Sequence, residues 1–180
     1  IKGDFHLMSF LKIIPVDSKN LKELQKISVT TFKETFVYQN TKENIESYLK
    51  INLSMKQIKK EFDNPFSEFY FAFNNKVIVG YLKLNFKSAQ SENVLKNKAY
   101  EIERIYILKS QQRKGFGRQL FEKAVDIGKS KGYKKLWLGV WENNKAAINF
   151  YKKLNLSKFD EHIFLLGKDI QTDFLMKYNF

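Results

Sequence analysis

The chain has 180 residues and a formal net charge of +13, with 32 Lys and Arg residues against 19 Asp and Glu residues. Hydrophobic residues make up 43% of the sequence and aromatic residues 16%, which excludes an intrinsically disordered chain and supplies material for one hydrophobic core. Because the sequence contains no cysteine, disulfides, thiolate metal ligands and a thiol nucleophile are excluded together.

The first third of the chain is predicted to be mostly helical. Residues 1–7 are expected to be an extension ahead of a natural start at Met8, which leaves residues 8–180 as one domain. The sequence then predicts a strand over residues 10–16 and three helices, which are capped by side chains that accept hydrogen bonds from backbone N–H groups. The caps are Ser18 for a helix over residues 19–31, Thr41 for a helix through Leu49, and Ser54 for a short helix that Asn64-Pro65 ends.

The remaining two thirds of the chain alternate between strands and helices. Alternating and apolar runs predict strands, and a 3.6-residue apolar period predicts helices. In chain order the predicted elements are a hairpin over residues 68–73 and 76–86, a polar loop over 88–97, a strand over 99–108, a helix over 115–131, a strand over 134–141, a helix over 144–154 and a terminal hairpin over 158–166 and 172–178. This order predicts an α+β fold with helices on the faces of a sheet.

The basic residues are of two kinds. Only three of the 32 are Arg, and all three lie between positions 104 and 118. Proteins that read nucleic acids rely on Arg for bidentate contacts, so the scattered Lys residues indicate a solvated surface and we do not expect a nucleic-acid partner. The Arg cluster instead predicts one local site for an anion.

A glycine-rich loop is predicted between the strand at 99–108 and the helix that follows it. The segment Gln112-Arg113-Lys114-Gly115-Phe116-Gly117 allows a tight turn and exposes backbone amides at a helix N-terminus, where an anion is favoured. Arg113, Lys114 and Arg118 add positive charge, as a pyrophosphate site requires. The segment is neither a Walker loop nor a complete GxGxxG fingerprint, which fails at Leu120. Taken alone, it is equally compatible with an ordinary helix start that carries surface charges.

A second motif follows about thirty residues later. Asn144, Ala147 and Tyr151 form N-x-x-A-x-x-x-Y at the start of the next predicted helix. With this motif, residues 101–156 resemble the Gcn5-related N-acetyltransferase (GNAT) family, whose acetyl-CoA motif Q/R-x-x-G-x-G/A is matched by Gln112, Gly115 and Gly117. The chain departs from the family at Asn155-Leu156, where Gly-Phe is frequent, and we interpret this as a local packing change.

The resemblance implies a fold and a co-substrate site. The fold is a mixed, mostly antiparallel seven-stranded sheet with helices on both faces, splayed between its fourth and fifth strands, with acetyl-CoA in the gap of a core at about residues 99–156. Backbone groups of residues 105–107 would pair with the pantetheine, and residues 113–118 would hold the pyrophosphate. The implied cofactor-binding residues are Ile105, Tyr106, Ile107, Gln112, Arg113, Lys114, Gly115, Phe116, Gly117, Arg118, Asn144, Ala147 and Tyr151.

Three segments outside the predicted acetyl-CoA core indicate the class of the amine substrate. Residues 31–36, 64–70 and 167–173 resemble bacterial spermidine/spermine N-acetyltransferases, which implies a polyamine acceptor. Three alternatives remain open: acetylation of a protein N-terminus, a Lys or another small amine; a basic nucleic-acid-binding domain; and a CoA-binding sensor without catalysis. A polyamine should be repelled by a cationic protein, so this substrate requires a locally acidic pocket within the basic shell.

The chemistry needs an acid and a base, because an amine with a pKa near 10 is almost fully protonated at pH 7. In the absence of a covalent nucleophile motif, we expect direct transfer in a ternary complex. The resemblance assigns the general acid to Tyr151, although periodicity alone makes this residue an aromatic core residue. Glu103 shares the strand alternation of Ile105 and Ile107 and is the predicted base.

Two alternatives to these assignments stay open. Glu101 has the same alternation as Glu103, and either residue is equally well an exposed carboxylate paired with Arg104 or a Lys.

His6 and His162 are isolated, so no metal site is expected. No apolar run approaches the roughly 20 residues that span a bilayer and no signal pattern is visible, so we expect no membrane partner and a cytoplasmic location. A homodimer would be in keeping with the family.

Overall fold

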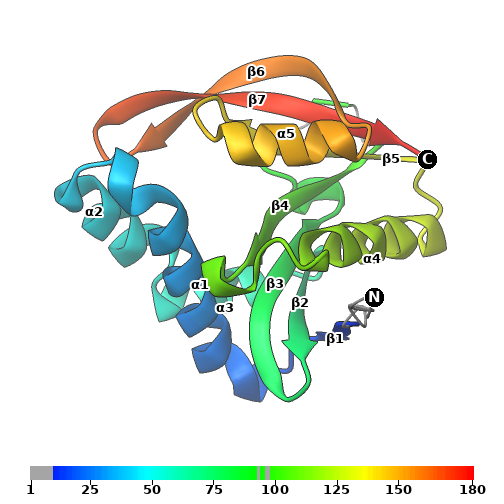
Figure 1. The fold of residues 1–180 in the computed structure, drawn as a ribbon, viewed down its shortest axis with the longest axis horizontal. Coiled ribbons are helices and arrows are strands. Elements are labelled where there is room, and N and C mark those ends of the chain that lie inside the picture. The colour runs from blue at the N-terminus through cyan, green and yellow to red at the C-terminus, as the bar shows by residue number, and fades with distance from the viewer. Residues whose placement is uncertain (1–9, 93, 96–97) are drawn as a thin grey trace, which may run out of the picture.

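The computed structural model describes residues 10–92, 94–95 and 98–180, so the expected extension at residues 1–7 lies outside the described residues. The strands form one seven-stranded sheet in the order β1-β2-β3-β4-β5-β7-β6 (Figure 1). Neighbouring strands are antiparallel except for β4 and β5. Their bounds are β1 (Lys12–Pro15), β2 (Ser67–Asn74), β3 (Val77–Asn85), β4 (Tyr100–Ile107), β5 (Lys135–Trp141), β6 (Ser157–Leu166) and β7 (Asp169–Asn179).

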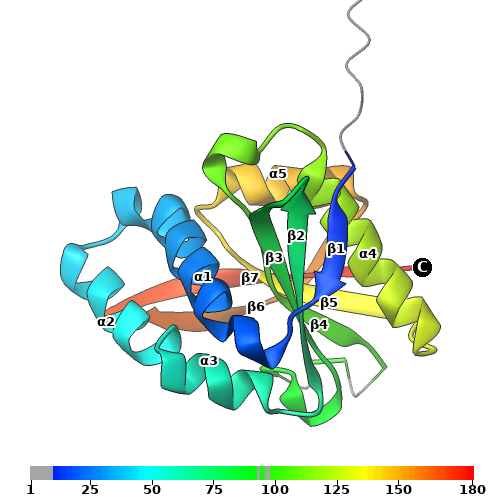
Figure 2. The ribbon, with the colours of Figure 1, turned by 90° about the horizontal axis from the view of Figure 1, so that it is seen from below.

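Helices cover both faces of the sheet, as predicted (Figure 2). One buried cluster joins α1, α2 and α3 to β2 and β3 through residues such as Leu24, Ile58 and Tyr81. A second cluster joins α4 and α5 to the opposite face, with Leu120 and Leu136 fully buried. The helices are α1 (Leu21–Phe36), α2 (Lys42–Asn52), α3 (Met55–Phe62), α4 (Phe116–Ser130) and α5 (Lys145–Lys153).

Two of the three predicted helix caps are confirmed. The hydroxyl groups of Thr41 and Ser54 accept hydrogen bonds from the third residue beyond each, at 3.2 Å in both cases. The prediction of Ser18 as the first cap is wrong, because the Asp17 carboxylate accepts from Lys19 N–H at 3.0 Å and opens a 3₁₀ turn before α1. The helix also runs past its predicted end to Phe36, because Phe32 is buried there and stacks on Tyr48 at 4.3 Å.

The sheet splays between its fourth and fifth strands, which are β4 and β5. They pair only through Tyr100 with Leu136 and through Glu101 with Trp137. Beyond Glu101, no pairing joins β4 to β5, so the edge of β4 that faces β5 is open over residues 102–107. This is the opening that the family resemblance implies.

Helix α4 is fixed so that its N-terminus lies at the open end of the splay. The C-terminal part of α4 packs against the paired end of β4, where Tyr100 donates a hydrogen bond to the Ala124 carbonyl at 2.7 Å. A Cβ atom at Gly128 would lie 2.3 Å from the Tyr100 ring, so only glycine permits this approach. Because α4 runs antiparallel to β4, its first turn lies beside the end of β4 at Ile107.

The tip of the β6–β7 hairpin is bonded to the start of α2. Asn44 donates to the Asp169 carboxylate at 2.7 Å and accepts from the Lys168 N–H at 3.1 Å. Gly167 adopts a positive φ of 62° in the turn, and β7 begins at Asp169, three residues before its predicted start at residue 172. The hairpin therefore bridges the sheet to the helical layer of α1–α3.

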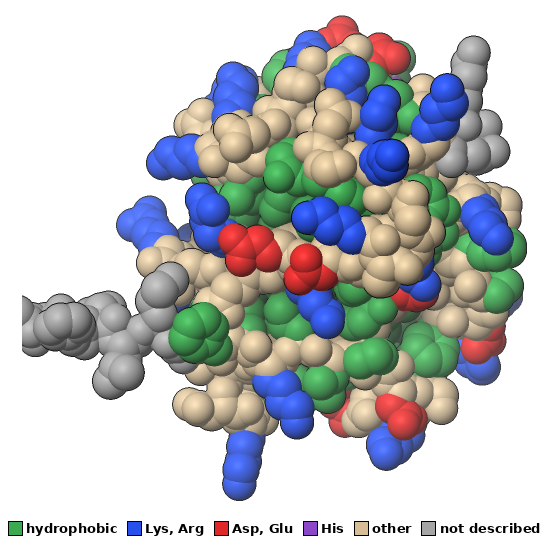
Figure 3. All heavy atoms as spheres, turned by 90° about the vertical axis from the view of Figure 1, so that its right-hand side faces the viewer, with side chains coloured by type: hydrophobic (Ala, Val, Ile, Leu, Met, Phe, Trp, Pro, Cys, Tyr) green, Lys and Arg blue, Asp and Glu red, His purple; other side chains and the backbone are tan. Residues whose placement is uncertain are grey.

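The surface charge is diffuse on the face that Figure 3 shows. Lys and Arg side chains are scattered over this face, with hydrophobic areas and a few acidic side chains between them (Figure 3). This distribution fits the solvated Lys surface expected from the sequence. None of the helices in the described part of the chain has the length and apolarity needed to cross a bilayer.

Candidate active site

The glycine-rich loop lies at the mouth of the splay. Arg113 and Gly115 both adopt left-handed backbone conformations, with φ values of 62° and 80°. No side chain caps α4 at Gly115, so the N–H groups of its first turn are available to an anion. Arg113, Lys114 and Arg118 are exposed around these groups. The loop therefore combines free amides with positive charge, which fits the phosphates of a nucleotide cofactor.

Three other residues of the loop hold it in place. Gln112 donates from its side chain to the Ile107 carbonyl at 3.1 Å, and Phe116 is buried at 1% exposure. A Cβ atom at Gly117 would lie 3.2 Å from the Phe150 ring, so this glycine brings α4 close to α5. Gln112, Phe116 and Gly117 thus position the loop, while its basic residues face solvent.

The conformation of Gly115 leads to a prediction. A Gly115→Ala variant should raise the KM for acetyl-CoA by about tenfold, since left-handed backbone costs other residues roughly 1–2 kcal/mol and the loop would relax away from its anion-binding shape. Initial rates at varied acetyl-CoA concentration measure this effect. Gly132→Ala is the matched control because Gly132 has a φ of 82° and, like Gly115, nothing within 4 Å of an added Cβ. An equal rise in both variants would contradict the prediction.

Helix α5 brings the second motif to the other side of the splay. The Asn144 side chain accepts a hydrogen bond from Ala147 N–H at 3.1 Å and so caps α5. Tyr151 is buried on the inner side of α5 at 8% exposure, and burial raises the pKa of its phenol well above the ordinary value of 10. Tyr151 is therefore a protonated donor throughout the neutral range. Asn155, in the position where the family has Gly, adopts a φ of 66°, which Asn tolerates better than most residues.

The alternation that we predicted for Glu103 is wrong. Lys83 pairs with Arg104 and its neighbour Leu84 pairs with Ile102, so a bulge skips Glu103 in the register. Glu103 therefore leaves the face of Ile105 and points toward Lys83 on the α1–α3 side of the sheet. A β-bulge inserts one residue and reverses the alternation of side chains on one side of it. The alternation of residue types along the sequence does not reveal such an insertion.

Glu103 is held by three donors. Its carboxylate lies 2.6 Å from Lys83 Nζ and 3.1 Å from an Arg104 nitrogen, and it accepts a hydrogen bond from Asn85 at 2.5 Å. Burial alone would raise the pKa of Glu103, but the Arg104 guanidinium and the Lys83 ammonium outweigh it and hold the pKa at about 2. Glu103 is thus an ionised carboxylate under all working conditions.

A fourth charged residue completes this cluster, and the sequence analysis missed it. Glu61 of α3 accepts two hydrogen bonds from Arg104, at 2.8 and 3.0 Å, and lies 2.9 Å from Lys83 Nζ. The signal that was available is Lys83 itself, a lone charge between Leu82 and Leu84 in an apolar strand, because a buried ammonium needs a counter-charge. Glu61, Lys83, Glu103 and Arg104 are called the charge cluster below.

Glu101, the alternative base, lies in a different environment. It is 3% exposed and accepts hydrogen bonds from the Ser91 N–H at 2.7 Å, the Ser91 hydroxyl at 2.5 Å and Asn85 at 3.1 Å. Burial and the neighbouring charge of Glu103 raise the pKa of Glu101. Both candidate carboxylates are therefore on the α1–α3 side of the sheet, with their pKa values shifted in opposite directions.

A second acidic region lies on the same face of the sheet, on the β5–β7–β6 side. Asp173 pairs with Trp141 of β5 and with His162 of β6, and its carboxylate lies 3.7 Å from His162 Nε2. Glu92 contacts the other ring nitrogen of His162. Burial raises the pKa of Asp173, and one of its oxygens is buried without a hydrogen-bond partner in the described structure. Within the described residues, Glu92 and Asp173 are paired with His162 and with no Lys or Arg.

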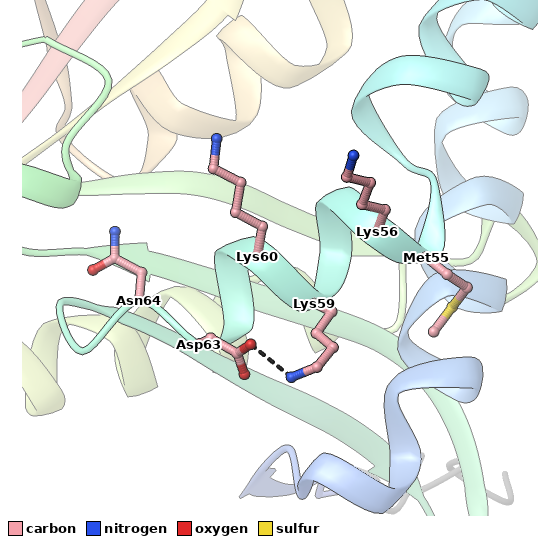
Figure 4. Close-up of a pocket in the computed structure, with 6 residues that line it drawn as sticks. All are labelled: Met55, Lys56, Lys59, Lys60, Asp63 and Asn64. Carbon is pink, nitrogen blue, oxygen red and sulfur yellow. Dashed lines mark hydrogen bonds and ion pairs between the residues drawn. The ribbon is translucent and has the colours of Figure 1, made fainter.

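A hollow of about 630 Å³ lies along α3 but does not coincide with these residues. It is lined by Lys56, Lys60 and neighbouring residues of α3, and Lys59 pairs with Asp63 at 2.6 Å (Figure 4). None of the predicted site residues lines it. Among the described residues, no group of three or more His, Asp or Glu side chains is arranged to hold a metal ion.

Known proteins share this architecture. The model of the acetyltransferase (GNAT) family matches residues 30–156. An uncharacterized N-acetyltransferase of Lactobacillus delbrueckii subsp. lactis is 44% identical over 170 residues, which cover 94% of this chain and 98% of the relative. The PaiA N-acetyltransferase of Thermoplasma acidophilum, solved in complex with coenzyme A, has a TM-score of 0.76 at 22% identity, with 95% of this chain and 99% of that chain covered. The smu.2055 protein of Streptococcus mutans has a TM-score of 0.69 at 25% identity, with 93% and 98% covered.

These similarities agree with the geometry of the site. The splayed sheet, the uncapped basic turn at the start of α4 and the Asn–Ala–Tyr helix occupy adjacent positions in the fold. The match of the family model extends over more than half of the chain, and the Lactobacillus relative aligns over nearly all of it. The chain therefore belongs to the acetyltransferase (GNAT) family and is an N-acetyltransferase that uses acetyl-CoA as its co-substrate.

Proposed function

We propose that this enzyme acetylates a primary amine, and that its acceptor is a polyamine such as spermidine or spermine. The observation that carries the proposal is the arrangement around the splay. A basic, uncapped helix N-terminus lies at the mouth of the opening, and carboxylates lie on the α1–α3 face of the sheet beside it. This arrangement separates a place for the anionic co-substrate from a place for a cationic acceptor. We treat residues 8–180 as a single N-acetyltransferase domain.

The co-substrate would occupy the open edge of β4. β5 makes no pairing with β4 over Ile105, Tyr106 and Ile107. Apart from the Ile107 carbonyl, which Gln112 bonds, the backbone groups on this edge could bond an extended chain as a strand would. The amides and side chains of residues 113–118 would hold the phosphates. PaiA, which has the same fold, was solved with coenzyme A, and this supports binding in the corresponding gap. Acetyl-CoA supplies the thioester carbonyl and a thiolate leaving group.

The protonation states of Tyr151 and Glu103 suit different roles in the reaction. Tyr151 remains protonated because burial raises its pKa, so it can donate a proton to the departing sulfur. Glu103 remains ionised, with a pKa of about 2. Direct transfer of a proton to it from an ammonium with a pKa near 10 would be strongly uphill, because the lowered pKa makes Glu103 a poor base. We therefore assign Glu103 to orienting and stabilising the amine while the proton leaves through water, and expect sequential kinetics in a ternary complex.

Asp173 and Glu92 supply the locally acidic region that a polyamine needs. The charge cluster balances two carboxylates against two cations, so it offers no net attraction to a second ammonium group. Asp173 and Glu92 carry no Lys or Arg partner among the described residues. The ring of Trp141, whose Cα pairs with that of Asp173, lies 6.0 Å from the Phe36 ring and provides apolar surface for a methylene chain.

This assignment leads to a prediction for Asp173. An Asp173→Asn variant should raise the KM for spermidine by about tenfold, because a charge-assisted hydrogen bond to the distal ammonium is lost. The KM values for acetyl-CoA and for a monoamine of similar length should stay near those of the wild type. Glu161→Gln is the control, since Glu161 is exposed beside His162 on β6 and pairs with Lys158 at 2.7 Å. Equal KM values for spermidine in Asp173→Asn and wild type would contradict the assignment.

The function itself is tested by release of free CoA thiol from acetyl-CoA with a panel of amines. Activity with spermidine or spermine, and intersecting lines in a two-substrate kinetic analysis, is the expected result. Activity with peptides alone would mean that the acceptor is a protein N-terminus or a Lys side chain and not a polyamine. Binding of acetyl-CoA without turnover would indicate a sensor. A parallel-line kinetic pattern would contradict direct transfer. A cytoplasmic location and a homodimer are part of the same proposal, with subcellular fractionation and sedimentation as their measurements.

A further inference from the structure

We propose that Glu61 is a positioning residue for acetyl transfer. Its carboxylate balances the second cation of the charge cluster, so that the cluster is neutral overall and Glu103 is ionised where the amine approaches it. The inference rests on the proposed function, because it assumes that a cationic amine approaches Glu103. Glu61 lies on α3, far from the GNAT motifs in the sequence, and reaches the catalytic strand only through the fold.

Lys83 and Arg104 each contact both carboxylates of the charge cluster. Lys83 Nζ lies 2.9 Å from Glu61 and 2.6 Å from Glu103, and Arg104 lies 2.8 Å from Glu61 and 3.1 Å from Glu103. Gln57, one turn earlier on α3, donates to Glu61 at 3.0 Å and fixes its orientation. Glu61 and Glu103 are thus coupled through two shared cations.

The charges of the cluster are poorly solvated. The side chains of Lys83 and Arg104 are 4% and 8% exposed, and that of Glu61 is 13% exposed. In such poorly solvated surroundings charges act strongly on one another. Two cations against Glu103 alone would leave one uncompensated positive charge, directly beside the carboxylate that the amine must reach. The Glu61 carboxylate removes this excess.

In the described structure no other carboxylate is paired with Lys83 or Arg104. Glu101, which lies on the same strand, bonds to Ser91 and Asn85 instead. The aromatic neighbours of the cluster, among them Phe69, whose ring centroid lies 5.5 Å from Lys83 Nζ, carry no formal charge. Compensation of the second cation therefore falls to Glu61.

A role of Glu61 that is limited to holding α3 against β4 leads to a different expectation from charge balance. If Glu61 only held the two elements together, loss of its carboxylate would weaken their packing, and additional loss of Lys83 would lower stability and activity further. If charge balance is what matters, removing one cation together with Glu61 should restore the enzyme. Glu103 and Arg104 would then remain as a balanced pair, and Met in place of Lys83 would put an apolar chain of similar length near the Phe69 ring.

The experiment compares Glu61→Gln with the double variant Glu61→Gln/Lys83→Met. Glu61→Gln should lower kcat/KM for spermidine by about tenfold, with the KM for acetyl-CoA within about twofold of wild type. The double variant should return to within about threefold of wild-type kcat/KM. Glu68→Gln and Glu68→Gln/Lys131→Met are the matched controls, because this pair has an N–O distance of 2.7 Å outside the charge cluster. Neither control should change kcat/KM. Thermal unfolding establishes that each variant is folded.

The outcomes separate this inference from the proposed function. A folded Glu61→Gln enzyme with wild-type kcat/KM, or a folded double variant no better than Glu61→Gln, would overturn the role of Glu61 while leaving amine acetylation in place. If Glu61→Gln unfolds, the folded double variant still decides, since charge balance predicts activity and a structural tie does not. A wild-type enzyme that binds acetyl-CoA but acetylates no amine would overturn the proposed function and, with it, this inference.

Discussion

A Tyr151→Phe variant is expected to lower kcat by about 10²-fold, with little change in the KM for acetyl-CoA. The substitution removes only the phenol oxygen, so the buried ring that packs below the splay is kept. Without the phenol, the sulfur leaves as an unprotonated thiolate. The measurement is steady-state thiol release at saturating amine and acetyl-CoA.

The pH dependence provides a second readout for Tyr151. Because burial raises its pKa above the ordinary value of 10, Tyr151 should not lose its proton as the pH rises to about 9.5. The wild-type rate should therefore increase with pH as the amine deprotonates, without a falling limb from Tyr151. Tyr178→Phe is the control, since Tyr178 packs against Phe121 and Phe180 in the same cluster. Wild-type kcat in Tyr151→Phe would remove the role of general acid.

A Glu103→Gln variant is expected to lower kcat/KM for the amine by about 10²-fold. The amide preserves the shape of the side chain but supplies no negative charge to the amine, and it leaves Lys83 and Arg104 with a single carboxylate. Glu101→Gln is the matched comparison, one pleat away on the same strand. A greater loss in Glu101→Gln than in Glu103→Gln would transfer the role to Glu101.

The same variant tests the electrostatics of the charge cluster through stability. The pKa of Glu103 is lowered from 4.5 to about 2, so between these values the unfolded chain binds more protons than the folded one. The stabilisation from Glu103 is then fully present above about pH 5 and is lost as the pH falls toward 2. The difference in unfolding free energy between wild type and Glu103→Gln, measured by chemical denaturation, should shrink over this range.

Helix α4 and strand β4 differ in how far their residues predict them. The helix at Phe116–Ser130 could be predicted because its buried residues recur with the helical period, and the loop before it because glycine has backbone conformations that other residues avoid. These are properties of neighbouring residues in the chain. The bulge at Glu103 could not be predicted, because it depends on how β4 registers with β3.

Local spacing and residue type are enough to predict the family, the order of the strands and helices along the chain, and the loop at residues 112–118. Which charges meet depends instead on how the chain folds. Glu61 and Arg104 are 43 positions apart in the chain and form two hydrogen bonds, and Asp173 faces His162 across a hairpin. Long-range contacts are fixed by the packing of α3 and of the β6–β7 hairpin around the sheet, and a buried charge takes whichever partner that packing brings within reach.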